Sequence, residues 1–470
     1  MLAAVNEILI DKVFSSTINL SAPSMAQFVE QLINVSAAEI SGDLKKGVGV
    51  QGRSTTQNSA FPLSNHSSRS GQGPRIFSLQ KLVEVADYNM DARPRIAWTQ
   101  MWELMARHFA AIGCHKNAMV SMYAIDALRQ LSFKFLQKPE LYDFNFQRVF
   151  LRPFLLIMEN PISREDIREL ILRCVDNMIR TLSCNLRSGW KIFFQIITLS
   201  AVDPCEKNST LGLAILQRLL DEHLEELCHR YAIDEYTSVD AGEQLAPEAL
   251  TLVQRKVRNA NAEDFVDLCR ASLSFVEIEA VKRPLPVGLS MRALCHTACY
   301  ADIISEQKVL PPVISQAVDP EGSFYSYEDL YGIEAEEMVL WKPIFDGLSA
   351  GISSRSLSSS GGLGCLVQRG SAITLRAILL RHGKRFSATQ WNVILKQVFL
   401  PSIQSAAESD RSPVTYITSE SPSVSSLDFV AESLSLPPGP DAESLMKFAA
   451  KAQSDEWSVM QYIFFILSPS

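Results

Sequence analysis

The chain repeatedly places apolar residues at the spacing of an α-helix. The clearest case has its apolar positions at offsets of 0, 3, 4, 7 and 11 residues: Trp98, Met101, Trp102, Met105 and Phe109. These side chains form one stripe at the 3.6-residue period, and Gly113 fits the end of that helix. Comparable stripes predict further helices at 119–135, 167–182, 190–197, 213–227 and 391–398.

The fold class follows from how these helices succeed one another. Alternation of apolar and polar residues, which is typical of half-buried strands, is rare in the chain. Helices of modest length, each with one apolar face and joined by short turns, bury that face by stacking on one another. We therefore predict an all-α fold, an α-solenoid of HEAT- or armadillo-like stacked helical hairpins with disordered Ser-rich insertions. No exact repeat is legible, so a compact helical bundle stays open as the alternative.

Polar stretches rich in Ser and Gly divide the helical segments. Such stretches carry too little apolar surface to offset the entropy of ordering them. We expect the following organisation, in chain order: an N-terminal helical segment (1–46), a disordered insertion (47–75), a helical domain (76–230), helical repeats (231–348), a Ser/Gly-rich loop (349–366), a further helical repeat (367–404), a linker (405–441) and a C-terminal helix (442–470).

Composition and charge narrow the function classes. The 470 residues include 44 Lys and Arg against 52 Asp and Glu, a net charge of −8, which argues against nucleic-acid binding by phosphate neutralisation. Nine scattered cysteines, an odd number, indicate reduced thiols. The first residues lack a signal-peptide pattern, and the longest apolar runs fall far short of the roughly 20 residues that cross a bilayer. We expect a protein that is soluble or peripheral on a membrane.

Candidate chemistry is sparse. Cys295, His296 and Cys299 offer three potential zinc ligands within five residues, but a structural site usually needs a fourth ligand and none is suggested nearby. Adjacent Cys–His pairs elsewhere point in different directions on a helix, so neither makes a nucleophile and its base. We therefore expect no catalytic residue, no metal and no cofactor, and interpret the chain as an interaction scaffold.

A series of long motifs resembles one known family. They occupy 77–90, 95–102, 126–136, 144–147, 150–154, 168–174 and 187–191. In order and content they resemble the region downstream of the catalytic domain in the large brefeldin-A-inhibited ARF guanine-nucleotide exchange factors, the BIG and yeast Sec-seven type. The resemblance covers about residues 77 to 200. A weaker one, at 340–348 and 382–401, is similar to a later helical region of the same proteins.

The resemblance implies a function as well as a fold. In this family the downstream region is an α-helical solenoid that regulates exchange and membrane recruitment by GTP-bound ARF-type GTPases, peripherally on trans-Golgi membranes in the cytoplasm. Exchange itself belongs to a separate domain whose loop pattern, Phe-Arg-Leu-Pro-Gly-Glu, does not occur here. We expect the chain to be a C-terminal portion of such a factor and not an exchange catalyst. A generic helical-repeat scaffold without GTPase binding is the alternative.

The motifs indicate which residues are candidates for partner binding and which for structural roles. We expect partner contacts from the polar and aromatic motif members Tyr88, Arg152, Arg187 and Lys191. We expect structural roles for the other signature residues, Trp98, Trp102, Asp126, Arg129, Gln130 and Trp190. The implied partners are a GTP-bound ARF-type GTPase and the Golgi membrane surface, and we also consider a homodimer.

Overall fold

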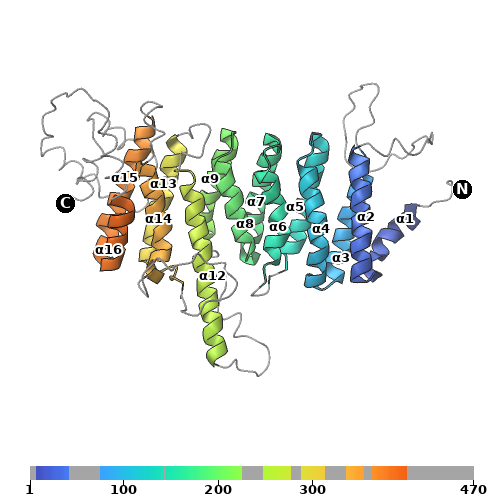
Figure 1. The fold of residues 1–470 in the computed structure, drawn as a ribbon, viewed down its shortest axis with the longest axis horizontal. Helices are drawn as coiled ribbons and strands as arrows, with labels where there is room; N and C mark the ends of the chain where they lie inside the picture. The colour runs from blue at the N-terminus through green and yellow to red at the C-terminus, as the bar shows by residue number, and fades with distance from the viewer. Residues whose placement is uncertain are drawn as a thin grey trace. The chain divides into compact units, whose positions relative to one another are not determined.

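The computed structural model is built from α-helices. It describes residues 7–41, 75–138, 140, 144–224, 247–276, 287–312, 335–353 and 363–399. These ranges contain fourteen α-helices and no strand (Figure 1), so the all-α prediction is confirmed. The predicted linker 405–441, the C-terminal helix 442–470 and all but residue 75 of the insertion 47–75 lie outside the described residues.

The chain divides into two compact units. The first comprises Met1–Met178 and Asn185–Ile192, and the second Ile179–Cys184 and Phe193–Ser470. The helices of the first unit, with two that continue into the second, are α1 (Glu7–Ser15), α2 (Ala22–Ser41), α3 (Phe77–Ala92), α4 (Arg95–Gly113), α5 (Ala118–Leu136), α6 (Phe146–Glu159), α7 (Glu165–Leu182) and α8 (Gly189–Ala201). The second unit adds α9 (Glu206–Glu222), α12 (Pro247–Leu273), α13 (Val287–Ser305), α14 (Ala335–Ser353), α15 (Leu363–His382) and α16 (Ala388–Ile394).

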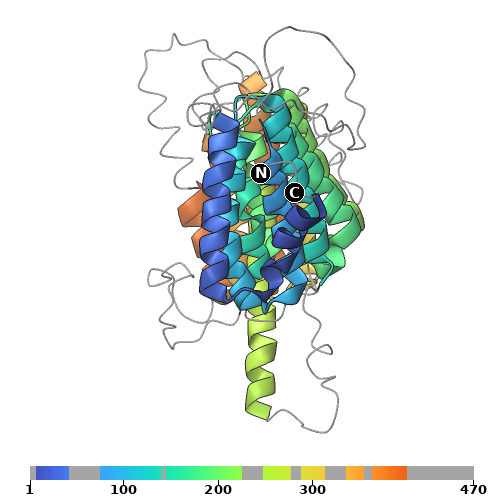
Figure 2. The same ribbon diagram turned by 90° about the vertical axis from the view of Figure 1, so that its right-hand side faces the viewer.

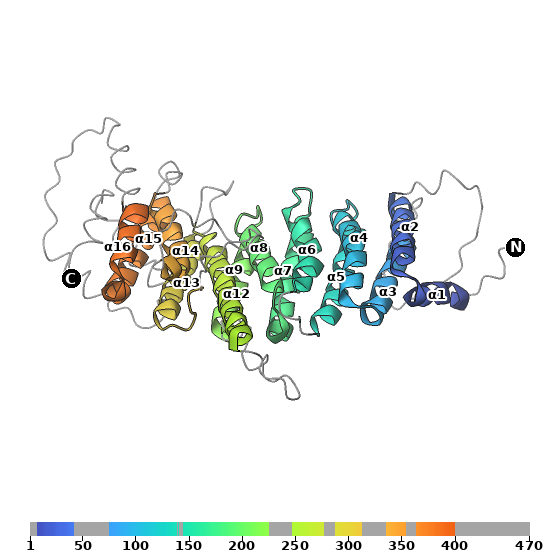
Figure 3. The ribbon, with the colours of Figure 1, turned by 60° about the horizontal axis from the view of Figure 1, so that its bottom comes forward.

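Helices of the first unit stack in sequence order. Each helix from α2 to α5 packs against the next helix in the chain. The helices α2, α3 and α4 also pack against the second helix after them, which is α4, α5 and α6 respectively. Figure 3 shows α3 to α6 following one another side by side. This pattern of near-neighbour contacts is typical of stacked helical hairpins. The predicted stacking is therefore confirmed within this unit.

An aromatic cluster forms the core of the first unit. Trp98 and Trp102, one turn apart on α4, stack with their ring centroids 5.3 Å apart. Trp102 also stacks on Phe150 of α6 at 4.3 Å, and Phe150 on Phe135 of α5 at 4.3 Å. The indole N–H of Trp102 donates to the Phe150 carbonyl (3.2 Å), so the buried polar atom is satisfied. The cluster joins three helices through the stripe that the sequence pattern predicts.

The α5 helix turns a slightly different face to the core than its sequence pattern suggests. Met119 and Met122, which belong to the predicted stripe, are 60% and 45% exposed. Val120 and Ala124 are buried in their place, whereas Leu128 faces the core as predicted. Val and Ala fit the close contact between helices, and the flexible Met side chains are tolerated at the surface.

The second unit repeats the same packing order. The α12 helix packs on α13 and α14, α13 on α14 and α15, and α14 on α15. The α9 helix packs on both α12 and α13. Figure 2 shows α12 extending beyond the ends of its neighbours in this unit. Stacking in sequence order is therefore confirmed here as well.

One close approach in the second unit requires a glycine. A Cβ atom on Gly212 of α9 would lie 1.8 Å from Ser200 Oγ and 2.9 Å from Ser200 Cβ on α8. Ser200 is fully buried and its hydroxyl donates to the Ile197 carbonyl (2.6 Å). The α8 and α9 backbones can approach this closely only because residue 212 has no side chain.

Three helix ends in the second unit differ from the sequence pattern. The α14 helix continues through Ser353 and α15 starts at Leu363, so helices extend into the predicted 349–366 loop from both sides. After Ile394 the α16 helix passes into a π-helical turn, Leu395–Phe399. Ser387 is the N-cap of α16 and forms a full capping box with Gln390.

Candidate functional site

A buried carboxylate ties the start of α6 to the start of α8. Glu140, which is 4% exposed, accepts a hydrogen bond from the Gln147 backbone N–H through Oε1 (2.8 Å). Its other oxygen, Oε2, accepts from the Ser188 N–H (2.9 Å), and the Ser188 hydroxyl donates to Oε1 (3.0 Å). A negative charge is favoured there because two helix N-termini direct backbone N–H groups toward it.

The Gln147 side chain completes this cluster. Its Oε1 accepts from the Arg187 N–H (2.7 Å) and the Gly189 N–H (3.3 Å), and its Nε2 donates to the Asn185 carbonyl (2.8 Å). A Cβ at Gly189 would lie 3.0 Å from Leu151 Cδ1 and 3.1 Å from Gln147 Oε1, so a larger residue would require these side chains to shift. Two motifs of the sequence, 144–147 and 187–191, therefore bind each other and fix the turn that starts α8.

The four residues predicted to contact a partner lie on three helices and in one turn. Tyr88 on α3 is 40% exposed, and Arg152 on α6 is exposed. Lys191 on α8 is half-buried, and Arg187, in the turn before α8, is 5% exposed. Tyr88 and Arg152 thus present their side chains to solvent, while Arg187 is part of the interior. The binding role of these residues stays a prediction.

The polar signature residues of α5 interact within their own helix. Asp126 accepts from Arg129 Nη2 (2.7 Å) and Nε (3.0 Å), and from Gln130 Nε2 (2.6 Å). These pairs at i+3 and i+4 give modest local stabilisation at a half-exposed surface. Among the tryptophans, Trp190 is fully buried, as are Trp98 and Trp102.

Sequence reasoning missed two of the residues that hold the fold together, Arg93 and Glu140. Arg93 at the end of α3 donates to the Thr17 carbonyl (3.0 Å) and the Leu20 carbonyl (2.7 Å), while Asn89 donates to Thr17 Oγ1 (3.0 Å). Glu140 is the other omission. Each of these side chains binds backbone or hydroxyl groups that are remote in sequence, and nothing in the local pattern marks such a contact.

The cysteine and histidine residues of α13 serve packing. His296, 3% exposed, hydrogen-bonds to the side-chain oxygen of Gln217 on α9 (2.6 Å), and its burial lowers its pKa to about 4. Burial also raises the pKa of the Cys299 thiol, with the Asp302 charge adding to it. In the part of the chain that the structure describes, no group of three or more His, Cys, Asp or Glu side chains is placed to hold a metal ion.

The HDS family is identified by comparison with known proteins. Residues 134–218, which include Glu140, Gln147 and Ser188, match the family model described as Mon2/Sec7/BIG1-like, HDS. This chain carries a Sec7-like HDS region. The resemblance seen in the sequence motifs is therefore confirmed, and the buried polar cluster lies inside the matched region.

Curated relatives of the HDS-containing chain are guanine nucleotide-exchange proteins. It is 34% identical over 392 residues to the brefeldin A-inhibited guanine nucleotide-exchange protein 2 of Arabidopsis thaliana, a match of 83% of this chain and 18% of that protein. It is 39% identical over 215 residues to the ADP-ribosylation factor guanine nucleotide-exchange factor sec71 of Schizosaccharomyces pombe (46% and 10%). With the brefeldin A-inhibited guanine nucleotide-exchange protein 1 of Rattus norvegicus the identity is 38% over 197 residues (42% and 9%). The chain thus spans less than a fifth of the length of these relatives.

Proposed function

We propose that this chain is a regulatory and interaction region of an ARF guanine-nucleotide exchange factor, one that binds GTP-bound ARF-type GTPase and thereby modulates exchange and membrane recruitment. The observation that carries the proposal is the 34% identity over 83% of the chain to a brefeldin A-inhibited guanine nucleotide-exchange protein. A stack of helices offers an extended surface, which is what an interaction region of this kind needs.

Exposed motif residues support an interaction surface on the first unit. The buried motif members, such as Gln147 and Trp102, are explained by the fold itself. Tyr88 and Arg152 are exposed, and the packing does not require them. Tyrosine and arginine are the residue types that most often dominate the energetics of protein interfaces. We therefore assign the GTPase contact to Tyr88 and Arg152, with Lys191 at its margin, and assign Arg187 to the support of the α8 turn.

The proposed location is the cytoplasmic face of trans-Golgi membranes, where vesicle-mediated transport begins. No described helix is long and apolar enough to cross a membrane. A net charge of −8 disfavours bulk attraction to anionic lipid, so a protein partner on the membrane would supply recruitment. In this proposal that partner is the GTP-loaded ARF.

Liposome binding tests the proposal. The full chain is incubated with liposomes that carry either GTP-loaded or GDP-loaded ARF, and the bound fraction is measured by co-sedimentation. We expect binding to the GTP form only, and weaker binding for Arg152→Glu and Tyr88→Ala. The matched control is Arg107→Glu, which reverses an exposed charge on α4 outside the assigned contact. Substituting Arg187 is avoided because a buried change would disturb the fold.

The alternative is a helical-repeat scaffold without a GTPase partner. It predicts equal and negligible binding of the chain to liposomes with either nucleotide form. It also predicts that the three surface variants behave alike. Such a result would contradict the proposed function while leaving the fold assignment intact.

A further inference from the structure

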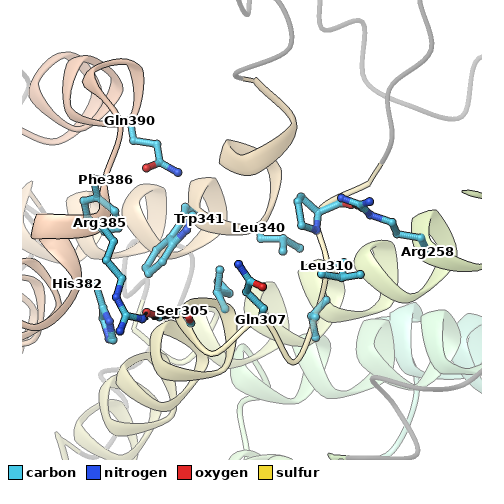
Figure 4. Close-up of a pocket in the computed structure, with 13 residues that line it drawn as sticks. Arg258, Ser305, Gln307, Leu310, Leu340, Trp341, His382, Arg385, Phe386 and Gln390 are labelled. Carbon is cyan, nitrogen blue, oxygen red and sulfur yellow. Dashed lines mark hydrogen bonds between the residues drawn. The ribbon is translucent and has the colours of Figure 1, made fainter.

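A pocket of about 340 Å³ lies in the second unit, among α12, α13, α14 and the segment from α15 to α16. Its floor is apolar and includes Leu340 and Trp341 of α14, which are 1% and 5% exposed. Figure 4 shows Arg385 and His382 at one end and Arg258 at the other, with Trp341 and Leu340 between them. The pocket therefore combines an apolar floor with charged groups at opposite ends.

The charge at the pocket is positive. Arg258 donates to the Pro311 carbonyl, and Arg385 donates to Ser305 Oγ (2.8 Å), so both guanidinium groups are held toward the pocket by neutral partners. Neither forms an ion pair with a carboxylate of the described residues, and no Asp or Glu belongs to the lining. Each guanidinium group has further N–H groups, which can donate hydrogen bonds to a carboxylate.

Gln307 lines the same pocket in an unfavourable backbone conformation. Its φ is 55°, and it is the one non-glycine residue with positive φ in the described part of the chain. The Gln307 N–H bonds to the Ile304 carbonyl (3.0 Å) and the Lys308 N–H to the Ile303 carbonyl (3.1 Å), which is the Schellman ending of a helix. Glycine is favoured at this position because it has no Cβ. Here a side chain is retained, and it extends along the pocket wall.

We propose that this pocket binds an acidic peptide segment that carries an aromatic side chain. The carboxylates would bind Arg385 and Arg258, and the aromatic ring would pack on the apolar floor against Trp341 and Phe386. The Gln307 amide, with one donor group and one acceptor group, would bind the peptide backbone. The inference does not depend on the proposed GTPase binding, which concerns the first unit.

The lining favours a peptide over a lipid headgroup. A phosphorylated inositol headgroup carries several negative charges and is usually bound by a cluster of basic residues. Only two arginines line this pocket, at opposite ends, and His382 is held against Asp302 (2.8 Å). Apolar and aromatic side chains make up much of the remaining wall, including Leu310, which is 48% exposed. A sugar phosphate would leave that wall unused, whereas an aromatic side chain fills it.

Fluorescence anisotropy with the full chain tests the proposal. The probe is an end-blocked, fluorescein-labelled peptide, Gly-Asp-Trp-Glu-Gly, in which the two carboxylates flank the ring as the two arginines flank the pocket floor. Two matched peptides, Gly-Asn-Trp-Gln-Gly and Gly-Asp-Ala-Glu-Gly, remove the charge or the ring. We expect saturable binding of the first peptide and affinity lower by about tenfold for either control, since each lost contact type contributes about that factor.

Variants locate the binding in the pocket. Arg385→Glu is expected to reduce affinity for the acidic aromatic peptide by about tenfold or more. Lys384→Glu makes the same charge change at the neighbouring exposed residue, which does not line the pocket, and is expected to leave affinity within about twofold. Gln307→Gly relieves the positive-φ conformation, so it is expected to fold at least as well as the parent chain and still to bind more weakly.

Three results would overturn this inference. The first is absence of saturable binding for the acidic aromatic peptide. The second is binding that Arg385→Glu and Gln307→Gly leave unchanged in folded protein, as verified by circular dichroism. The third is binding of vesicles containing phosphatidylinositol 4-phosphate that is lost in Arg385→Glu, together with no peptide binding, which would assign the pocket to a lipid headgroup.

Discussion

Glu140 accepts both hydrogen bonds that Ser188 can donate. The Ser188 N–H binds Oε2 at 2.9 Å and the Ser188 hydroxyl binds Oε1 at 3.0 Å, across 48 residues of sequence. Both residues are buried, and the same carboxylate accepts the Gln147 N–H. One side chain thus fixes the starts of two helices within the HDS region and sets how α8 follows α6 along the stack.

Glu140→Gln is expected to destabilise the protein. An amide cannot accept with both of its terminal atoms, so at least one buried N–H or O–H donor loses its partner. Leaving such a group unsatisfied costs about 1–3 kcal/mol. Urea unfolding followed by circular dichroism measures the change. Glu103→Gln, on the exposed face of α4, is the control and is expected within about 0.5 kcal/mol of the parent chain. Equal stability of the two variants would show that the cluster is dispensable.

Gly212→Ala is expected to destabilise the second unit, although alanine is the better helix former. Helix propensity alone predicts a gain of about 1 kcal/mol. The new Cβ would overlap Ser200 Oγ at 1.8 Å, and relieving so short a contact is expected to cost near the upper end of about 1–3 kcal/mol, which exceeds the propensity gain. Gly288→Ala on α13 is the matched control, because no atom of the described residues, apart from the adjoining backbone, lies within 4 Å of its Cβ position. Thermal unfolding of both variants gives the sign, and a stabilised Gly212→Ala variant would contradict the packing described for α8 and α9.

Stability is expected to fall between about pH 6.5 and pH 4. Burial lowers the pKa of His108, which hydrogen-bonds to Ser36 (3.0 Å), to about 4. The unfolded chain takes up this proton near pH 6.5 and the folded chain only near pH 4, so acid favours the unfolded state by roughly 3 kcal/mol at pH 4. His108→Gln removes the titrating group and keeps a polar side chain. The unfolding free energy of this variant is expected to depend less on pH in this window.

Comparison at pH 8 serves as the reference for the His108 prediction. Histidine is neutral in both states there, so the difference between parent chain and variant contains only the packing effect. Subtracting it from the difference at pH 5 isolates the protonation effect. A His108→Gln variant with the same pH dependence as the parent chain would show that other groups control acid stability.

The helical stack was predictable because the apolar period is a local property. Trp98, Trp102 and Phe109 share one face of α4 in the sequence pattern and in the structure. The buried face was less predictable for α5, because Met119 and Met122 extend its apolar pattern but are exposed to solvent. A run with apolar residues on more than one face does not specify which face is buried; the neighbouring helices decide it.

The candidate site was predictable only in part. The motifs identified the family, since their order and content are sequence properties. They did not distinguish Arg152, which is exposed, from Arg187, which is 5% exposed, because burial of a long cation depends on the turn that surrounds it. The sequence around Glu140 contains no pattern that indicates its buried role. The hydrogen-bond donors to Glu140 include the N–H groups of Gln147 and Ser188, and only the folded chain brings these groups together.

The nucleotide dependence of GTPase binding tests the central claim most directly. The dissociation constants of the full chain for soluble ARF carrying a non-hydrolysable GTP analogue and for ARF carrying GDP are measured by isothermal titration calorimetry. The account predicts that the GTP form binds tighter by at least about tenfold, or about 1.4 kcal/mol, and that Arg152→Glu removes most of this preference. Equal affinity for the two forms, or a preference that Arg152→Glu and Tyr88→Ala leave intact, would contradict it.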